Sequence, residues 1–237
     1  MLKSFKDKTL SIIVPAFNEE KTISEILNKI FQTDLSGWHK EVIVIDDGST
    51  DHTRALLESM SGRIRLLRHK TNRGKGAAIR TGLSEATGEV ILIQDADLEY
   101  DPKDYKILIK ALEENRALVV YGSRNLGRTP GGYFHYLWGG KLLTFLTNLL
   151  FRSKLTDINT GFKIFRADLI KKIPIVSDGF EFCEEITAKI LKRNIPIKEV
   201  SIHYYPRTFK EGKKIRFSDG LIGIWTILRY YFKSDAE

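Results

Sequence analysis

Acidic residues are concentrated in the stretch QDADLEYDP (94–102), which directly follows the apolar run EVILI. In an extended chain the side chains of residues i and i+2 point the same way, so Asp95 and Asp97 are expected to converge. Carboxylate oxygens suit Mg²⁺ or Mn²⁺, which commonly bind diphosphate oxygens as well. Asp95, Ala96 and Asp97 therefore predict a metal and diphosphate site, although exposed acids at a strand end would have the same short pattern.

Two other stretches place polar groups at the ends of apolar runs. Asp46 and Asp47 end the run EVIVIDD, where a carboxylate can accept a hydrogen bond from a ribose hydroxyl or a base N–H, or can cap the next helix. Pro15, Phe17 and Glu19 follow the first apolar run. The phenyl ring can pack on a base, and the carboxylate can reach a sugar hydroxyl or lie in the first helical turn. These positions are candidates for binding a nucleoside.

Lys75 lies in the glycine-containing stretch NRGKGAAIRTG (72–82). The lysine could approach a phosphate group, and the glycines on either side allow close backbone packing. The stretch is not a Walker A loop, because Ala77 stands where that loop has Ser or Thr. A solvated helix start would explain the same residues, so a phosphate contact and a plain helix start both stay open.

The elements that position these residues alternate between strand and helix in the first half. Strands are expected at 9–17, 41–49, 64–67, 89–97 and 117–124, and helices at 18–33, 54–60, 74–88 and 102–115. Continuous apolar strands separated by helices predict an α/β fold with a mostly parallel sheet flanked by helices. Ligands of such sheets bind outside the carboxyl ends of the strands, so the acids after 45 and 94 should share one edge.

The second half has a different composition, but no clear linker separates it, and we expect a single domain over 1–237. We divide it into a nucleotide-sugar-binding half (about 8–124) and an acceptor-binding half (about 125–237). The segments expected in the second half are a loop at 125–140, an apolar helix within 133–151, a turn at 157–162, a late strand at 198–206 and a C-terminal amphipathic helix at 220–232.

The composition restricts the partners and the compartment. The chain has 237 residues and a formal net charge of +8, which favours an anionic partner, and its single cysteine excludes an internal disulfide. We expect a cytoplasmic protein, because no N-terminal apolar run suits a signal peptide. A nucleic-acid-binding module would not be expected to carry a rim of strand-end acids, so no nucleic acid is expected. A receiver-like signalling domain would not need the second half.

The two apolar segments of the second half allow three interpretations. They could lie on a membrane surface, with aromatic side chains at the interface, cover the sheet, or form a homodimer contact. We favour the membrane surface for at least one of them, because the chain is basic. The protein would then be peripheral on the cytoplasmic face of a membrane. The aromatic residues expected at that interface are Trp138, Trp225, Tyr230 and Tyr231.

The ordered set of motifs VPAFNE, VIDDGSTD, NRGKGAAIRTG, QDADLEYDP, YGSR and NTGFKIF resembles family-2 glycosyltransferases. It is most similar to the dolichyl-phosphate mannose synthase-like and polyprenyl-phosphate hexosyltransferase branch. The resemblance extends from Leu10 to about Arg216. It implies a GT-A fold, a nucleotide-diphosphate sugar as donor, a divalent metal (Mg²⁺ or Mn²⁺) and inversion at the anomeric carbon.

The resemblance also implies roles for individual residues. Those expected to bind the nucleotide sugar are Pro15, Phe17, Glu19, Asp46, Lys75, Asp95 and Ala96. Those expected at the metal are Asp95, Asp97 and Glu99. Those expected to be catalytic are Asp97, Arg124 and Arg207. Those expected to bind the acceptor phosphate are Arg124, Arg207, Lys213 and Lys214. The chain departs from the branch at Glu99, where glutamine is usual, and in the shifted basic loop RTFKEGKK.

The acceptor remains open between two chemical classes. A polyprenyl phosphate, dolichyl or undecaprenyl, offers an anionic oxygen and needs no general base; we favour this acceptor for a hexose from a GDP- or UDP-linked donor. A sugar hydroxyl of a glycan or glycolipid would need a carboxylate base, and Glu184 and Glu185 are the candidates. Adjacent helix positions do not share a face, so one of these two glutamates is expected to be solvated.

Overall fold

The computed structural model describes residues 8–114, 117–126, 134–207 and 217–233. Its centre is a seven-stranded sheet in the order β3-β2-β1-β4-β6-β5-β7. The strands are β1 (Thr9–Ala16), β2 (His39–Asp46), β3 (Arg65–Arg68), β4 (Val90–Ile93), β5 (Val119–Ser123), β6 (Lys163–Arg166) and β7 (Ile197–Ser201). All neighbouring strands are parallel except that β6 runs antiparallel to both β4 and β5. The predicted mostly parallel α/β sheet is confirmed.

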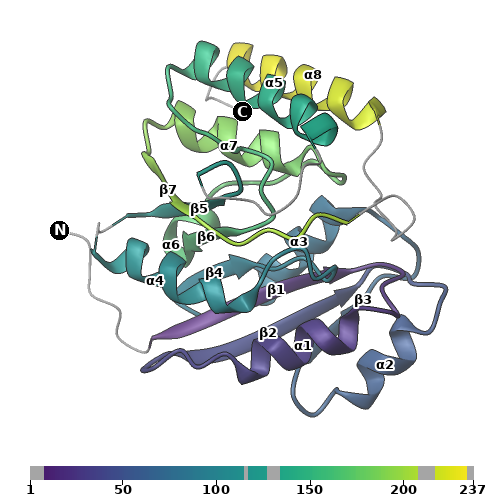
Figure 1. The fold of residues 1–237 in the computed structure, drawn as a ribbon. Helices are drawn as coiled ribbons and strands as arrows, with labels where there is room; N and C mark the ends of the chain where they lie inside the picture. The colour runs from purple at the N-terminus through teal and green to yellow at the C-terminus, as the bar shows by residue number, and fades with distance from the viewer. Residues whose placement is uncertain (1–7, 115–116, 127–133, 208–216, 234–237) are drawn as a thin grey trace.

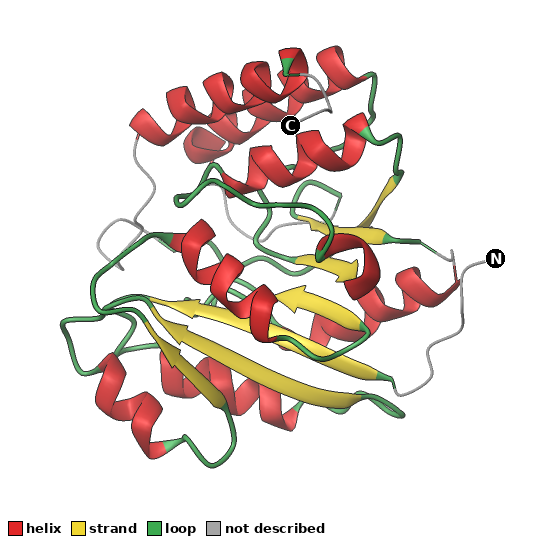
Figure 2. Ribbon diagram, turned by 180° about the vertical axis from the view of Figure 1, so that it is seen from behind, coloured by secondary structure: helices red, strands yellow, loops and turns green. Residues whose placement is uncertain are grey.

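Helices cover both faces of the sheet (Figure 1). They are α1 (Ile23–Gln32), α2 (Thr53–Ser59), α3 (Lys75–Glu85), α4 (Tyr105–Glu114), α5 (Phe134–Phe151), α6 (Ala167–Ile170), α7 (Phe182–Lys192) and α8 (Phe217–Phe232), with a 3₁₀ turn η1 (Pro102–Asp104) before α4. One core cluster joins the sheet to α1, α2 and α4, and a second joins the opposite face to α3, α6 and α7. The view from behind in Figure 2 shows the same layers.

Two helices form an additional layer. α5 and α8 lie side by side over α7, at the top of Figures 1 and 2. Their inner side chains form a third core cluster that includes Leu143 and Ile227. None of the helices in the described residues combines the length and the apolar character that crossing a membrane requires.

Local sequence signals explain most of these elements. Ile23, Ile26, Leu27 and Ile30 recur at helical spacing and are all buried on the inner side of α1. Asp101 accepts a hydrogen bond from the backbone N–H of Lys103 (3.0 Å), so it caps the turn that the following proline opens. The C-terminal helix predicted at 220–232 is present as α8.

Three expectations about elements need correction. The strand predicted at 89–97 ends at Ile93, so Asp95 and Asp97 lie in the loop beyond it and strand alternation does not align them. The loop predicted at 125–140 overlaps α5, which begins at Phe134. Residues 163–166, to which no strand was assigned, form β6, which lies inside the sheet between β4 and β5.

Candidate active site

The loops after β1 and β2 are hydrogen-bonded to each other at the carboxyl ends of their strands. The backbone N–H of Asn18 donates to Ser49 Oγ (3.1 Å), and the backbone N–H of Glu19 donates to Thr53 Oγ1 (2.8 Å). Asp46, at the end of β2, is buried and accepts from the backbone N–H of Ser49 (2.9 Å). These contacts hold the candidate nucleoside residues of the two loops on one edge of the sheet.

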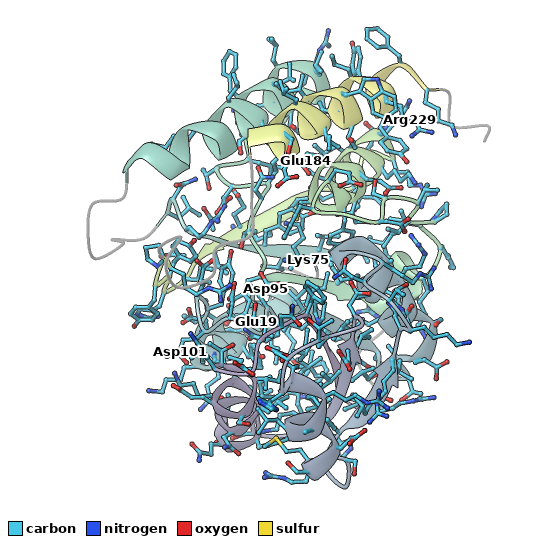
Figure 3. The ribbon with its side chains drawn as sticks, turned by 90° about the vertical axis from the view of Figure 1, so that its right-hand side faces the viewer. Glu19, Lys75, Asp95, Asp101, Glu184 and Arg229 are labelled. Carbon is cyan, nitrogen blue, oxygen red and sulfur yellow. The ribbon has the colours of Figure 1, made fainter. Side chains whose placement is uncertain are left out.

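Two cationic side chains, Lys75 and Arg207, form three ion pairs with acids at this edge. Lys75 Nζ, at the start of α3, lies 2.6 Å from Asp95 Oδ1. Arg207 reaches two acids at once: its Nη2 lies 2.7 Å from Asp97 Oδ2, and its Nη1 lies 3.2 Å from Glu19 Oε2. Figure 3 shows Glu19, Lys75 and Asp95 close to one another in the middle of the molecule.

Glu99 completes the group, which we call the acidic cluster. Its Oε1 accepts from the backbone N–H of Arg207 (2.8 Å), and its Oε2 accepts from the Tyr204 hydroxyl (3.1 Å). Glu99 therefore fastens the segment that carries Arg207, and both of its carboxylate oxygens have partners within the chain. The acidic cluster consists of Glu19, Lys75, Asp95, Asp97, Glu99 and Arg207.

The electrostatics of the acidic cluster favour one more cation. Four carboxylates face two cationic side chains, so the fully ionised cluster has two more negative than positive groups. Burial, followed by the negative charges of Asp95 and Glu99, raises the pKa of Asp97 to about 7. Burial alone would lower the pKa of Lys75, but Asp95 and the other acidic groups around it together outweigh burial, and the pKa of Lys75 is raised. An additional cation would relieve this repulsion.

The carboxylates suit a divalent ion that takes most of its ligands from diphosphate oxygens and water. No group of three or more His, Cys, Asp or Glu side chains suited to a metal occurs among the residues that the structure describes. Mg²⁺ and Mn²⁺ sites that use diphosphate oxygens and water need only one or two carboxylates, which Asp95 and Asp97 supply. Both are engaged in ion pairs, so an ion would bind in exchange for Lys75 or Arg207.

Asp47 positions Lys75. Its Oδ1 and Oδ2 accept from the backbone N–H groups of Arg73 (2.9 Å) and Gly74 (2.8 Å), and His69 Nδ1 lies 2.6 Å from Oδ1. Gly74 has a φ of +98°, and a β-carbon there would collide with the backbone oxygen of Asp178. The loop before α3 is thus held tightly, and it presents Lys75 to the acidic cluster.

Arg124 is bound to an acid that sequence reasoning did not single out. Its Nε and Nη2 donate to the two carboxylate oxygens of Asp157 (2.6 and 2.7 Å), and its guanidinium lies over the Tyr204 ring at 5.2 Å. Burial would raise the pKa of Asp157, but Arg124 outweighs this effect, and the pKa is lowered. The pair joins the end of β5 to the loop that contains NTGF, whose motif was recognised without a role for this aspartate.

That loop supports Asp95 from behind. The backbone N–H of Gly161 donates to the Tyr100 hydroxyl (2.8 Å), and a β-carbon on Gly161 would collide with the Asp95 carboxylate. The buried ammonium of Lys163 donates to the backbone oxygens of Ile158 (2.8 Å) and Thr160 (2.5 Å), which fixes the same loop. Sequence spacing gave no sign of Tyr100 and Lys163, because their partners lie in the turn.

The two adjacent glutamates of α7 are both buried, at 3% and 0% exposure, so the expectation that one is solvated is wrong. Glu185 accepts from the backbone N–H of Ser177 (2.7 Å) and from the Tyr230 hydroxyl (2.9 Å), which makes it a structural residue. Glu184 accepts from the Asn159 amide, and burial raises its pKa to about 7.

The remaining predicted residues are placed as follows. Pro15 and Phe17 are half-buried at the end of β1, and Ala96 is buried between the two aspartates. Lys213 and Lys214 lie outside the described residues. Tyr230, expected at a membrane interface, is buried instead.

The mostly parallel sheet and the acidic cluster at its edge fit the family resemblance that the sequence motifs show. Residues 11–174 match glycosyl transferase family 2, and the chain belongs to that family. A solved structure of glucosyl-3-phosphoglycerate synthase from Mycobacterium tuberculosis, in complex with Mn²⁺, UDP and phosphoglyceric acid, has a TM-score of 0.74. It covers 97% of this chain and 80% of its own at 22% identity, a likeness that shows the GT-A fold.

Two named relatives are similar over most of this chain. A dodecaprenyl-phosphate galacturonate synthase of Rhizobium johnstonii is 29% identical over 84% of the chain. The chain spans 59% of that relative's length. A dolichyl-phosphate beta-glucosyltransferase of Dictyostelium discoideum is 30% identical over 92% of the chain and 76% of its own length.

Proposed function

We propose that this protein transfers a hexose, with inversion, from a GDP- or UDP-linked sugar to a dolichyl or undecaprenyl phosphate. The observation that carries the proposal is the acidic cluster, in which Asp95 and Asp97 each meet a cation at the edge of the sheet where ligands bind. Membership of family 2 supports the reaction type. The names of the two relatives support a polyprenyl phosphate as the acceptor.

In this proposal the donor binds along the edge of the sheet. Glu19 and Asp46 accept hydrogen bonds from the nucleoside, Phe17 packs on its base, and Lys75 lies next to the diphosphate. A Mg²⁺ or Mn²⁺ ion held by Asp95 and Asp97 would supply positive charge at the diphosphate. Glu99 is left out of the metal ligands, because both of its oxygens bind the segment that carries Arg207.

The transfer forms a bond between the acceptor phosphate oxygen and the anomeric carbon, while the bond to the nucleotide diphosphate breaks and its electron pair leaves with the diphosphate. An anionic phosphate oxygen requires no general base. Arg207 is assigned to the two phosphate groups, since a planar guanidinium binds phosphate oxygens in pairs. Lys213 and Lys214 are proposed to bind the acceptor phosphate together with Arg207. Arg124, tied to Asp157, holds the loop behind Asp95.

The reaction is tested by incubating the protein with labelled GDP- and UDP-sugars and a polyprenyl phosphate, with donor hydrolysis as the control. Labelled lipid should appear with one donor. Asp97→Ala should abolish transfer, whereas Asp101→Ala, in the same stretch but serving as a helix cap, should retain it. Labelled lipid from no donor, or normal turnover by Asp97→Ala, would contradict the proposal.

A second candidate is transfer to a sugar hydroxyl with Glu184 as general base. The observation that favours it is the pKa of about 7, which suits a base at neutral pH. Glu184→Gln preserves the size of the side chain and should then lower turnover of a glycan acceptor by about 10²–10⁴-fold. With a polyprenyl phosphate the same variant should remain active, which separates the two candidates.

A polyprenyl phosphate is dissolved in a bilayer, so the proposal places the protein at the cytoplasmic face of a membrane. The sequence also suggested a homodimer. Membrane binding and dimer formation were both expected to use the apolar segments of the second half.

A further inference from the structure

Large apolar side chains gather on the outer side of the α5 and α8 layer. Twelve large hydrophobic side chains are exposed within the described residues, and eight of them belong to these two helices. We call these eight the outer face: Leu142, Phe145, Leu149, Leu221, Ile222, Trp225, Tyr231 and Phe232. Phe145 is 65% exposed and Trp225 58%. A concentrated apolar surface of this kind marks an interaction site.

The two helices are parallel and in register. The rings of Phe151 and Tyr231 lie 5.6 Å apart at the C-terminal ends of the helices. A β-carbon on Gly223 would lie 3.2 Å from the methyl groups of Leu143, about two turns from the N-terminal ends of the two helices. Both pairs are separated by 80 positions in the sequence, which places Phe145 and Trp225 at the same level along the two helices. The exposed apolar side chains of the two helices therefore lie at matching levels of one layer.

The fold does not need the outer face. The inner sides of the two helices already have their own buried residues, among them Leu143 and Ile227. A helix that is apolar on its outer side as well gains nothing from that side in water, because those side chains stay hydrated. The outer face is explained by a partner rather than by the stability of the chain.

The charges around the outer face are basic. Lys141 lies within α5 and Arg152 directly follows it, and both are exposed. Arg229 is exposed on α8, with its guanidinium 5.1 Å from the Trp225 ring. The sequence of α5 contains no acidic residue, and that of α8 contains only Asp219. The partner is therefore expected to be apolar at its centre and negatively charged where the basic side chains meet it.

We propose that the outer face of α5 and α8 docks the protein on the surface of an anionic bilayer. Aromatic and aliphatic side chains enter the boundary between headgroups and acyl chains, and Lys141, Arg152 and Arg229 pair with lipid phosphates. A second copy of the chain is the poorer partner, because a symmetric contact would bring like charges together. This docking rests on the proposed function, because a polyprenyl phosphate acceptor lies in such a bilayer.

The test uses the full chain and vesicles that contain no polyprenyl phosphate. Phosphatidylcholine vesicles with and without phosphatidylglycerol are floated on a density gradient with the wild type and with Phe145→Glu/Trp225→Glu. The wild type should float with the anionic vesicles and detach as salt is raised. The double variant should bind at least about tenfold more weakly, because two large apolar side chains no longer enter the bilayer.

Ile107→Glu is the matched control, because Ile107 is an exposed apolar residue of α4, away from the α5 and α8 layer. It should bind like the wild type, and all three proteins should unfold at similar temperatures. Equal flotation of the double variant and the wild type overturns the proposal. So does a wild type that ignores vesicles but forms a dimer that the double variant lacks. Normal docking without any sugar transfer would instead refute only the proposed function.

Discussion

Replacing Arg207 with methionine is expected to change how the binding of a divalent ion depends on pH. The change keeps an unbranched side-chain stem but removes the guanidinium whose Nη2 lies 2.7 Å from Asp97 Oδ2. With Arg207 in place, burial and the neighbouring acids hold the pKa of Asp97 at about 7. An opposite charge at this range lowers a carboxyl pKa by about 1–3, so its loss should move the midpoint that far upward.

The sign follows from the ionised fraction. A group with a pKa of about 7 is half ionised at neutral pH. A midpoint about 1–3 pH units higher leaves about a tenth or less as carboxylate. Since only the carboxylate binds the ion, Mn²⁺ binding by Arg207→Met should rise with pH to a midpoint about 1–3 pH units above that of the wild type. Once Asp97 is ionised, the affinity of the variant should exceed that of the wild type, because the guanidinium that competes with the ion is absent.

The assay is a Mn²⁺ titration followed by electron paramagnetic resonance between about pH 6 and 8.5, a range that spans the midpoint of Asp97. The affinity of the wild type should level off near neutral pH, whereas that of Arg207→Met should still rise at the alkaline end. Arg207→Lys keeps a cation and should resemble the wild type. A curve for Arg207→Met with the wild-type midpoint, or with a lower one, would refute this account of the acidic cluster.

Two further substitutions test the loop behind Asp95. Asp157→Ala removes the buried carboxylate that pairs with the half-buried guanidinium of Arg124, and it should cost about 3–5 kcal/mol of unfolding free energy in a denaturant titration; a loss below about 1 kcal/mol would mean that the pair is unimportant. Gly161→Ala places a methyl group against the Asp95 carboxylate. It should weaken Mn²⁺ and donor binding more than it lowers the unfolding temperature, and unchanged donor affinity would speak against it.

The sequence predicted those parts of the fold that local pattern determines. Helix α1 follows from apolar residues at helical spacing, and the alternation of apolar runs with helices predicts a mostly parallel sheet. Strand β6 was not predicted, because it has only four residues, the first three of them buried, and directly follows a turn. A buried run this short shows no alternation that would distinguish a strand.

The residues of the acidic cluster were predicted as site residues, but the ion pairs between them were not. Asp95 and Asp97 were identified as a pair, yet the contact of Asp97 with Arg207 joins residues 110 positions apart, and no local pattern encodes it. The burial of Glu184 and Glu185 was also beyond sequence reasoning. Helix α7 packs on the sheet with one side and on α8 with another, so it lacks the solvated face that a surface helix has.

The place of β6 in the sheet has a consequence for how the chain is made. Strand β5 has only β6 and β7 as neighbours in the sheet, and β6 also closes the open edge of β4. All three pairings wait for residues that leave the ribosome well after β5 itself. Until then β4 presents an unpaired edge, the kind of surface that recruits other strands. The first 124 residues should therefore not survive alone as a soluble fragment, and the nascent chain should depend on chaperones until β6 inserts.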